Sequence, residues 1–132
     1  MKKRGLAAAL AMLTMATTGT AFAATSFWQP VYYTNVGYNA STVKKVANAA
    51  HAHIRVTESN HNELSTNYLV TRADNGVQMT QGAFVISNGD RSRKSNPYKS
   101  GYYQYSGNCV LRINAAQQEA NYTVWGEWNP NG

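Results

Sequence analysis

The chain has 132 residues, of which 43% are hydrophobic and 14% are charged, and its formal net charge is +6. Three of the twelve basic residues, Lys2, Lys3 and Arg4, precede an apolar run, so the other nine, against six acidic residues, leave +3 for the rest. This balance excludes an extended nucleic-acid-binding surface but permits weak attraction to anionic surfaces.

Residues 1–23 have the layout of a secretory signal peptide. The three basic residues form its positive start, GLAAALAML supplies its apolar core, and AFA (21–23) places small residues where a signal peptidase reads them. The apolar run is shorter than the roughly 20 residues that span a bilayer. We therefore expect cleavage after Ala23 and one secreted domain, residues 24–132, with no transmembrane segment.

Residues 39–51 (NASTVKKVANAAH) admit two interpretations. Ser41 or Thr42 would cap a short helix. That helix would present one apolar stripe, formed by Val43, Val46, Ala47 and Ala50. The two valines and the strand-like sequence on either side favour a strand instead, so the sequence leaves open whether this segment is helix or strand.

The stretch HAHIRVTESNH (51–61) contains all the histidines of the chain: His51, His53 and His61. In a strand, His51, His53, Arg55 and Thr57 share one face, while Ala52, Ile54 and Val56 face the core. A His-x-His pair can chelate zinc, with His61 or Glu63 as a third ligand. However, Arg55 would repel a dication, and no group is evident to orient the rings. We predict a polar strand face without metal or cofactor, and keep the three histidines as weaker metal-site candidates.

Seven runs from residue 53 onward are typical of strands: HIRVT, NYLVTR, VQMTQ, AFVIS, GYYQYS, CVLRIN and YTVWGEW. They are rich in Val, Ile, Tyr and Trp and are separated by Asn, Gly, Ser and Asp. About seven short strands at near-regular spacing predict one mainly β domain, a small antiparallel sandwich or barrel.

ADNGVQ predicts a tight hairpin turn at Asn75-Gly76, since both residues tolerate a positive φ. Pairing outward from this turn brings Arg72 opposite Met79 and Val70 opposite Gln81. The same pairing predicts a core face formed by Tyr68, Val70 and Met79.

The segment GDRSRKSNPYKS (89–100) follows a second turn signal at Asn88-Gly89. Asn96-Pro97 and the serines disfavour regular structure, so we expect a long exposed loop. Against the single acid Asp90, the segment carries four basic residues: Arg91, Arg93, Lys94 and Lys99. This composition predicts either a solvated connector or a contact with anionic envelope polymers.

Aromatic residues form three groups in the sequence: Tyr102, Tyr103 and Tyr105; Tyr32, Tyr33 and Tyr38; and Trp125 and Trp128. Flat rings stack on sugars, and tyrosine-rich strand faces also bind proteins. Tyrosine equally favours half-buried strand positions that cover a core. The candidate binding surface predicted from the sequence combines the basic segment with the first tyrosine group: Arg91, Arg93, Lys94, Lys99, Tyr102, Tyr103 and Tyr105.

The one cysteine, Cys109, excludes a disulfide within the chain, so the domain must depend on its core. In GNCVLRIN, Cys109 alternates with Leu111 and Ile113, a pattern typical of a buried cysteine. We predict a core thiol; an exposed thiol that dimerises and a catalytic nucleophile are the alternatives.

The order of leader, NYLVTRADNGVQMTQG, polar stretch and YYQYSGNCVLRINAAQQEANYTVWGEW resembles the small secreted Gram-positive proteins of domain-of-unknown-function family 2712. The best match is the last third, which ends in Gly126-Glu127-Trp128. The resemblance implies an exported, mainly β domain with no assigned activity, in a family often considered alongside transporter or bacteriocin-type gene clusters. It supplies no functional residue.

The sequence contains no Gly-x-Ser-x-Gly elbow, no recognisable pair of catalytic acids and no phosphate-binding glycine loop. We therefore predict a secreted, non-enzymatic binding protein at or near the bacterial cell envelope. Its expected partners are anionic envelope polymers or a cell-surface protein, and not nucleic acid. The alternative is a bacteriocin-like secreted toxin that acts on membranes or wall precursors, and a cell-wall hydrolase is the least favoured.

Overall fold

The computed structural model of the chain describes residues 24–34, 37–117 and 119–132. The predicted signal peptide, residues 1–23, lies outside the described residues. Within the described ranges, no helix has the length and hydropathy needed to cross a bilayer.

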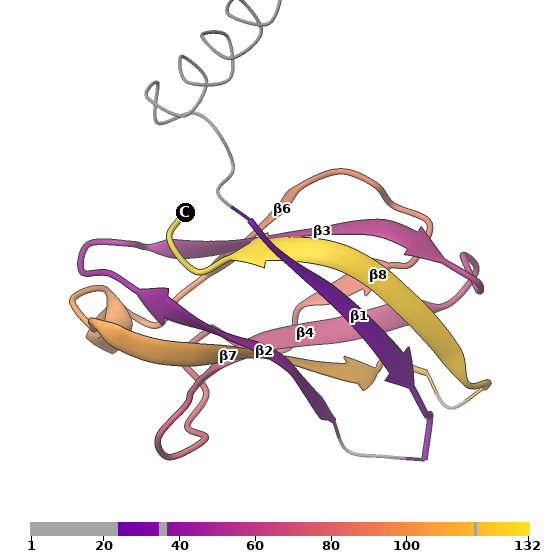
Figure 1. Ribbon diagram of the computed structural model, residues 1–132, viewed down its shortest axis with the longest axis horizontal. Coiled ribbons are helices and arrows are strands. Elements are labelled where there is room, and N and C mark those ends of the chain that lie inside the picture. Colours follow the sequence, from indigo (N-terminus) through magenta and orange to yellow (C-terminus); the bar gives the residue numbers. More distant parts are fainter. Residues whose placement is uncertain (1–23, 35–36, 118) are drawn as a thin grey trace, which may run out of the picture.

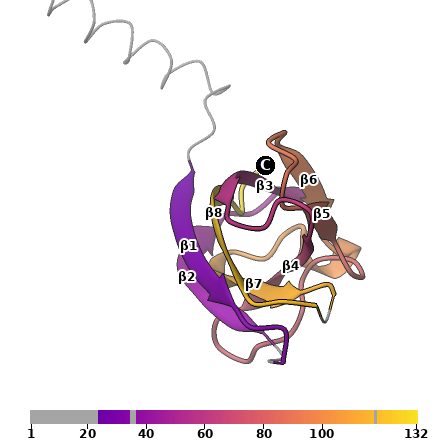
Figure 2. The same ribbon diagram turned by 90° about the vertical axis from the view of Figure 1, so that its right-hand side faces the viewer.

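The described chain forms two antiparallel sheets of four strands each (Figure 1). In spatial order, the first sheet contains β1 (Thr25–Val31), β8 (Tyr122–Asn129), β3 (His51–Ser59) and β6 (Lys94–Pro97). The second sheet contains β2 (Tyr38–Lys45), β7 (Gly107–Ala115), β4 (Ser65–Arg72) and β5 (Val85–Ser87). The view in Figure 2 shows the two layers, with β1 and β2 next to each other at one side. The predicted mainly β fold is confirmed, as a sandwich rather than a barrel.

The core lies between the sheets and is built by alternation along the strands. Ala52, Ile54 and Val56 of β3 are fully buried, as predicted, and so are Cys109, Leu111 and Ile113 of β7. Trp128, the largest fully buried side chain, donates a hydrogen bond from Nε1 to Ser41 Oγ at 2.6 Å. This bond joins β8 of the first sheet to β2 of the second.

The helix considered for residues 39–51 is wrong. Residues 38–45 form β2, which pairs with β7 through a bulge between Asn39 and Ser41. A turn follows, in which Asn48 adopts a positive φ of 69°, and β3 begins at His51. The pairing with β7 makes this segment a strand. It also places Lys45, at the end of β2, in the interior rather than on a solvated helix face.

The expectation of an exposed loop over residues 89–100 is also wrong in part. Lys94–Pro97 forms β6 and pairs with His51–Ile54 of β3. Asn96 and Tyr98 are fully buried, and the Tyr98 hydroxyl donates to the Pro130 carbonyl at 2.8 Å. Because β6 is an edge strand, Pro97 is tolerated there without loss of a ladder hydrogen bond.

The strand predicted for GYYQYS is wrong. Ser100–Tyr102 forms a 3₁₀ turn, η1, and the amide of Tyr105 donates to the Tyr102 carbonyl at 3.2 Å. In this curled segment the carbonyls of Tyr103 and Tyr105 accept hydrogen bonds from the ammonium group of Lys45.

The hairpin after β4 has a longer loop than predicted. Arg72 N donates to Val77 O, and the observed bridge joins Thr71 to Gln78. Arg72 therefore does not lie opposite Met79, and VQMTQ forms isolated bridges instead of a strand. The register differs by two residues, and a shift of two keeps each side chain on its face. The predicted core face of Tyr68, Val70 and Met79 is consequently confirmed, all three being fully buried.

Candidate functional site

Two tryptophans stand side by side on the outer face of the first sheet. The register places Trp28 of β1 opposite Trp125 of β8. Their neighbours Phe27 and Val124 point into the core, so the two indoles project outward. Trp28 is 61% exposed, and Trp125 is partly exposed. Because the two rings adjoin, they form a contiguous exposed apolar patch, which is a feature of interaction sites.

Charged side chains flank the indoles on the same face. Arg55 of β3 lies opposite Glu127 of β8, and the two form an ion pair of 2.7 Å. Glu58 lies opposite Trp125, because the register shifts between Val56 and Glu58. The outer face therefore presents two flat rings beside carboxylate and guanidinium groups.

A shallow open depression of about 350 Å³ adjoins this face at the edge of β3. Since β6 pairs with only His51–Ile54, the later residues of β3 have no strand beside them on that side within the described chain. The depression is lined by Arg55, Val56, Thr57 and Arg91.

Arg91 is held in place by neutral acceptors. Its Nη1 donates to the Asn88 carbonyl, and its Nη2 donates to Asn62 Oδ1 at 2.9 Å. Asn88 is itself buried, accepting from Thr66 Oγ1 at 2.6 Å and donating to the His61 carbonyl at 3.0 Å. This chain of hydrogen bonds anchors the guanidinium to the core.

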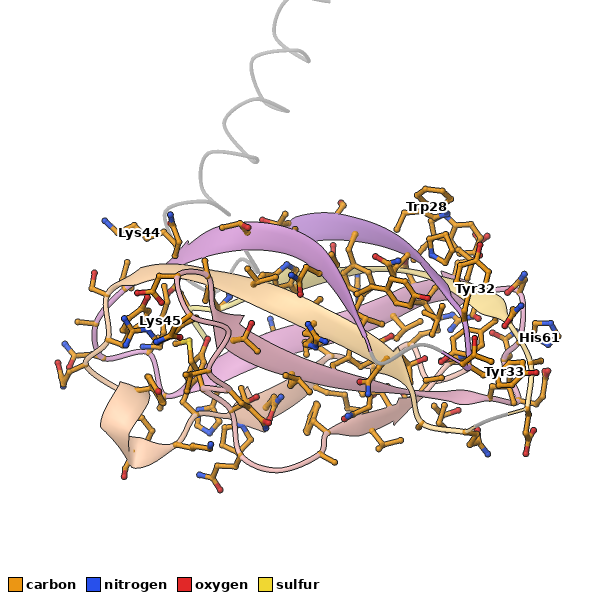
Figure 3. The ribbon with its side chains drawn as sticks, turned by 90° about the horizontal axis from the view of Figure 1, so that it is seen from below. Trp28, Tyr32, Tyr33, Lys44, Lys45 and His61 are labelled. Atoms are coloured by element: carbon orange, nitrogen blue, oxygen red, sulfur yellow. The ribbon has the colours of Figure 1, made fainter. Side chains whose placement is uncertain are left out.

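Further aromatic side chains are exposed where β1 ends. Tyr32 is 46% and Tyr33 is 38% exposed, and the Tyr32 ring lies 6.2 Å from the Tyr38 ring. Figure 3 shows Trp28, Tyr32 and Tyr33 at one end of the molecule with His61, while Lys44 and Lys45 lie at the opposite end. We refer to Trp28, Trp125, Tyr32 and Tyr33 as the aromatic platform.

The binding surface predicted from the sequence is divided between the two ends of β6. Arg91 and Arg93 precede β6 and Lys94 begins it, whereas four members follow it: Lys99, Tyr102, Tyr103 and Tyr105. Lys94 pairs with Asp90 at 2.8 Å. The rings of Tyr102 and Tyr105 pack edge to face, with 6.1 Å between their centroids. They lie at the end of the sandwich where Lys45 donates to the Tyr105 carbonyl. Only Arg91 of these seven lines the depression.

His51 and His53 lie where alternation predicts, on the face of β3 that points away from the core. His53 Nδ1 is 3.0 Å from Ser95 Oγ, and burial, with Arg93 nearby, lowers the pKa of His53. His61 lies beyond the other end of β3, where its Nδ1 is 2.6 Å from Glu63 Oε1 and lowers the pKa of that carboxyl. The described residues contain no group of three His, Cys, Asp or Glu side chains placed to hold a metal ion.

Cys109 is a core thiol, as predicted. It is fully buried, and its Sγ lies 3.2 Å from the Val43 carbonyl as donor. Burial raises the pKa of the thiol to about 12, although the Lys45 charge opposes the shift. A thiol protonated to this degree is a poor nucleophile at neutral pH.

Sequence reasoning missed Trp28, Arg55 and Glu127 as members of one surface. The run TSFWQPV could have been recognised as a strand, because Phe27 and Val31 alternate inward with Trp28 outward. No local signal, however, shows that Trp28 pairs with a residue 97 positions later.

Comparison of the chain with protein-family models, with curated proteins and with solved structures found no match. The resemblance to domain-of-unknown-function family 2712 stays a prediction.

Proposed function

We propose that this is a secreted, non-enzymatic protein that binds a glycan polymer of the bacterial cell envelope on the aromatic platform. The observation that supports this function best is the pairing of Trp28 and Trp125 on the outer face of one sheet. Indole rings offer a large apolar surface with little conformational freedom, which suits stacking against the apolar faces of sugar rings.

The polar neighbours of the platform suit the same ligand. Glu58, Glu127 and Arg55 place acceptors and donors beside the indoles, and sugar hydroxyls both donate and accept hydrogen bonds. Paired strands set the backbone positions of these groups, and the ion pair holds the Arg55 and Glu127 side chains in place before the ligand arrives. This preorganisation lowers the entropic cost of binding.

Sedimentation of purified protein with isolated Gram-positive cell walls tests this function. Trp28→Ala should weaken binding by about tenfold, equivalent to about 1.4 kcal/mol, without loss of fold, since the side chain is exposed. Tyr33→Ala should also weaken binding, whereas Tyr103→Ala should not. The two variants form a matched pair, because both side chains are 38% exposed but only Tyr33 belongs to the platform. Equal binding by wild type and Trp28→Ala would contradict the proposal.

The toxin alternative is tested with the same preparation. Purified protein applied to a lawn of Gram-positive cells should leave growth unchanged if the protein only binds the envelope. A zone of inhibition that wild type produces and Trp28→Ala does not would instead assign the platform to a bacteriocin-like toxin.

A further inference from the structure

We propose that the depression beside β3 binds an oxyanion, a phosphodiester or a carboxylate, carried by the polymer that lies on the aromatic platform. The identity of the polymer rests on the proposed function, whereas the anion site rests on its own residues: Arg91, Arg55 and Thr57.

Arg91 supplies a positive charge that no acid in the described part of the chain neutralises. Both acceptors of its guanidinium, the Asn88 carbonyl and Asn62 Oδ1, are neutral. Among the described residues, no carboxylate lies within ion-pair distance of it. A guanidinium has five N–H donors, so those not used by Asn88 and Asn62 remain for a ligand. Its planar shape matches the two oxygens of a carboxylate or phosphate.

Arg55 and Thr57 line the depression with Arg91. Glu127 pairs with Arg55 at 2.7 Å and thereby fixes that guanidinium on the outer face. The Thr57 hydroxyl adds a neutral donor. The two acids of this face, Glu58 and Glu127, stand opposite Trp125 and Arg55 and do not line the depression. The depression is therefore positive, because Arg91 adds an unpaired charge to it, whereas the charge of Arg55 is paired with that of Glu127.

The position of the depression relates it to the platform. Trp28, Trp125 and Glu58 occupy one row across β1, β8 and β3. Neighbouring strands are about 4.8 Å apart, so the edge of β3 lies roughly 10 Å from Trp28. A polymer whose rings lie on the indoles would bring a charged group a short distance along its chain to Arg91. The site thus selects negatively charged polymers over neutral ones.

The test compares three soluble probes by calorimetric titration of the purified protein: poly(glycerol phosphate), polygalacturonate and a neutral glucan. Wild type should bind at least one charged probe about tenfold tighter than the glucan. Arg91→Gln should remove that preference and leave glucan binding unchanged. Lys99→Gln is the control, because Lys99 is exposed and lies beyond the other end of β6. Tighter binding of poly(glycerol phosphate) assigns a phosphodiester, and tighter binding of polygalacturonate assigns a carboxylate.

The failures of the two proposals are distinguishable. If Trp28→Ala abolishes glucan binding while Arg91→Gln and Lys99→Gln behave alike with every probe, the anion site is wrong and the platform stands. If Arg91→Gln abolishes binding of polygalacturonate, the charged probe that has sugar rings, while Trp28→Ala binds it normally, the anion site stands and the platform is wrong. Should Arg91→Gln fail to fold, as judged by circular dichroism, Thr57→Val takes its place, because Thr57 lines the depression but is not among the polar neighbours of the indoles. Thr57→Val should reduce the preference for the charged probe and leave glucan binding unchanged.

Discussion

The ammonium group of Lys45 lies over the ring of Tyr98, 4.8 Å from its centroid, in the interior of the sandwich. The same nitrogen donates to the carbonyls of Val46, Tyr103 and Tyr105 at 3.1, 3.1 and 3.3 Å. Burial lowers the pKa of this amine from its ordinary value. Lys45 thereby connects the end of β2 to the segment that follows η1.

Replacement of Lys45 should destabilise the fold. Lys45→Met fills similar space but removes the donor from the carbonyls of Val46 and Tyr105, whereas the Tyr103 carbonyl still accepts from the Asn48 amide at 2.8 Å. The free energy of unfolding should therefore fall by about 2 kcal/mol. Lys44→Met is the matched control, because the neighbouring side chain is exposed and its loss should change stability by less than about 0.5 kcal/mol. Urea denaturation followed by circular dichroism measures both, and equal midpoints would show that the buried ammonium contributes nothing.

Cys109 should react with a thiol reagent only after unfolding, because its side chain is fully buried. Its pKa of about 12 in the folded protein exceeds the ordinary 9.0. Between pH 9 and about pH 12 the thiol is protonated in the folded protein and ionised in the unfolded chain, so unfolding releases a proton. The contribution of the thiol to stability is therefore complete below pH 9 and declines as pH rises through this range. The decline should be about 1.4 kcal/mol for each pH unit. Cys109→Ala should flatten this slope; rapid labelling of the native protein would contradict the buried position.

Zinc should not bind tightly to the strand that carries His51 and His53. The two rings share a face with Arg55, whose charge opposes a dication, and His61 is paired with Glu63 elsewhere. Isothermal titration at neutral pH should detect no stoichiometric submicromolar site. Such a site, if it disappeared in His51→Ala and His53→Ala, would establish a metal centre.

Secretion should be accompanied by cleavage after Ala23. When the full chain is expressed in a Gram-positive host, N-terminal sequencing of the protein in the medium should begin at Ala24, since AFA offers small residues to the peptidase. Arrest of uncleaved protein in the membrane fraction would contradict the signal-peptide prediction. Ala21→Arg with Ala23→Arg serves as the cleavage-deficient control.

The sequence predicted best those strands in which one face is buried and the other is wet. The alternation of Ile54 and Val56 with Arg55, and of Leu111 and Ile113 with Arg112, determines which side faces the core without knowledge of the partners. The same reasoning failed where a distant contact decides the local structure. Tyr103 and Tyr105 occur in a strand-like run, yet their carbonyls bind Lys45, which precedes them by 58 and 60 residues.

The candidate site was less predictable than the fold for the same reason. Asn96 and Pro97 are turn residues by local preference, but pairing with β3 places them in β6. Trp28 and Trp125 become neighbours only through the pairing of β1 with β8. Arg91 was recognised as a candidate from charge alone, whereas its fixed position depends on Asn62 and Asn88.

All four outer strands of the sandwich are blunted. β1 contains Pro30, which lacks a backbone donor, β2 carries the bulge between Asn39 and Ser41, and β5 and β6 have three and four residues. Short edges, proline and bulges are the devices that prevent strands of separate molecules from joining. Copies of this protein can therefore lie close together without fusing into a continuous intermolecular sheet or fibril.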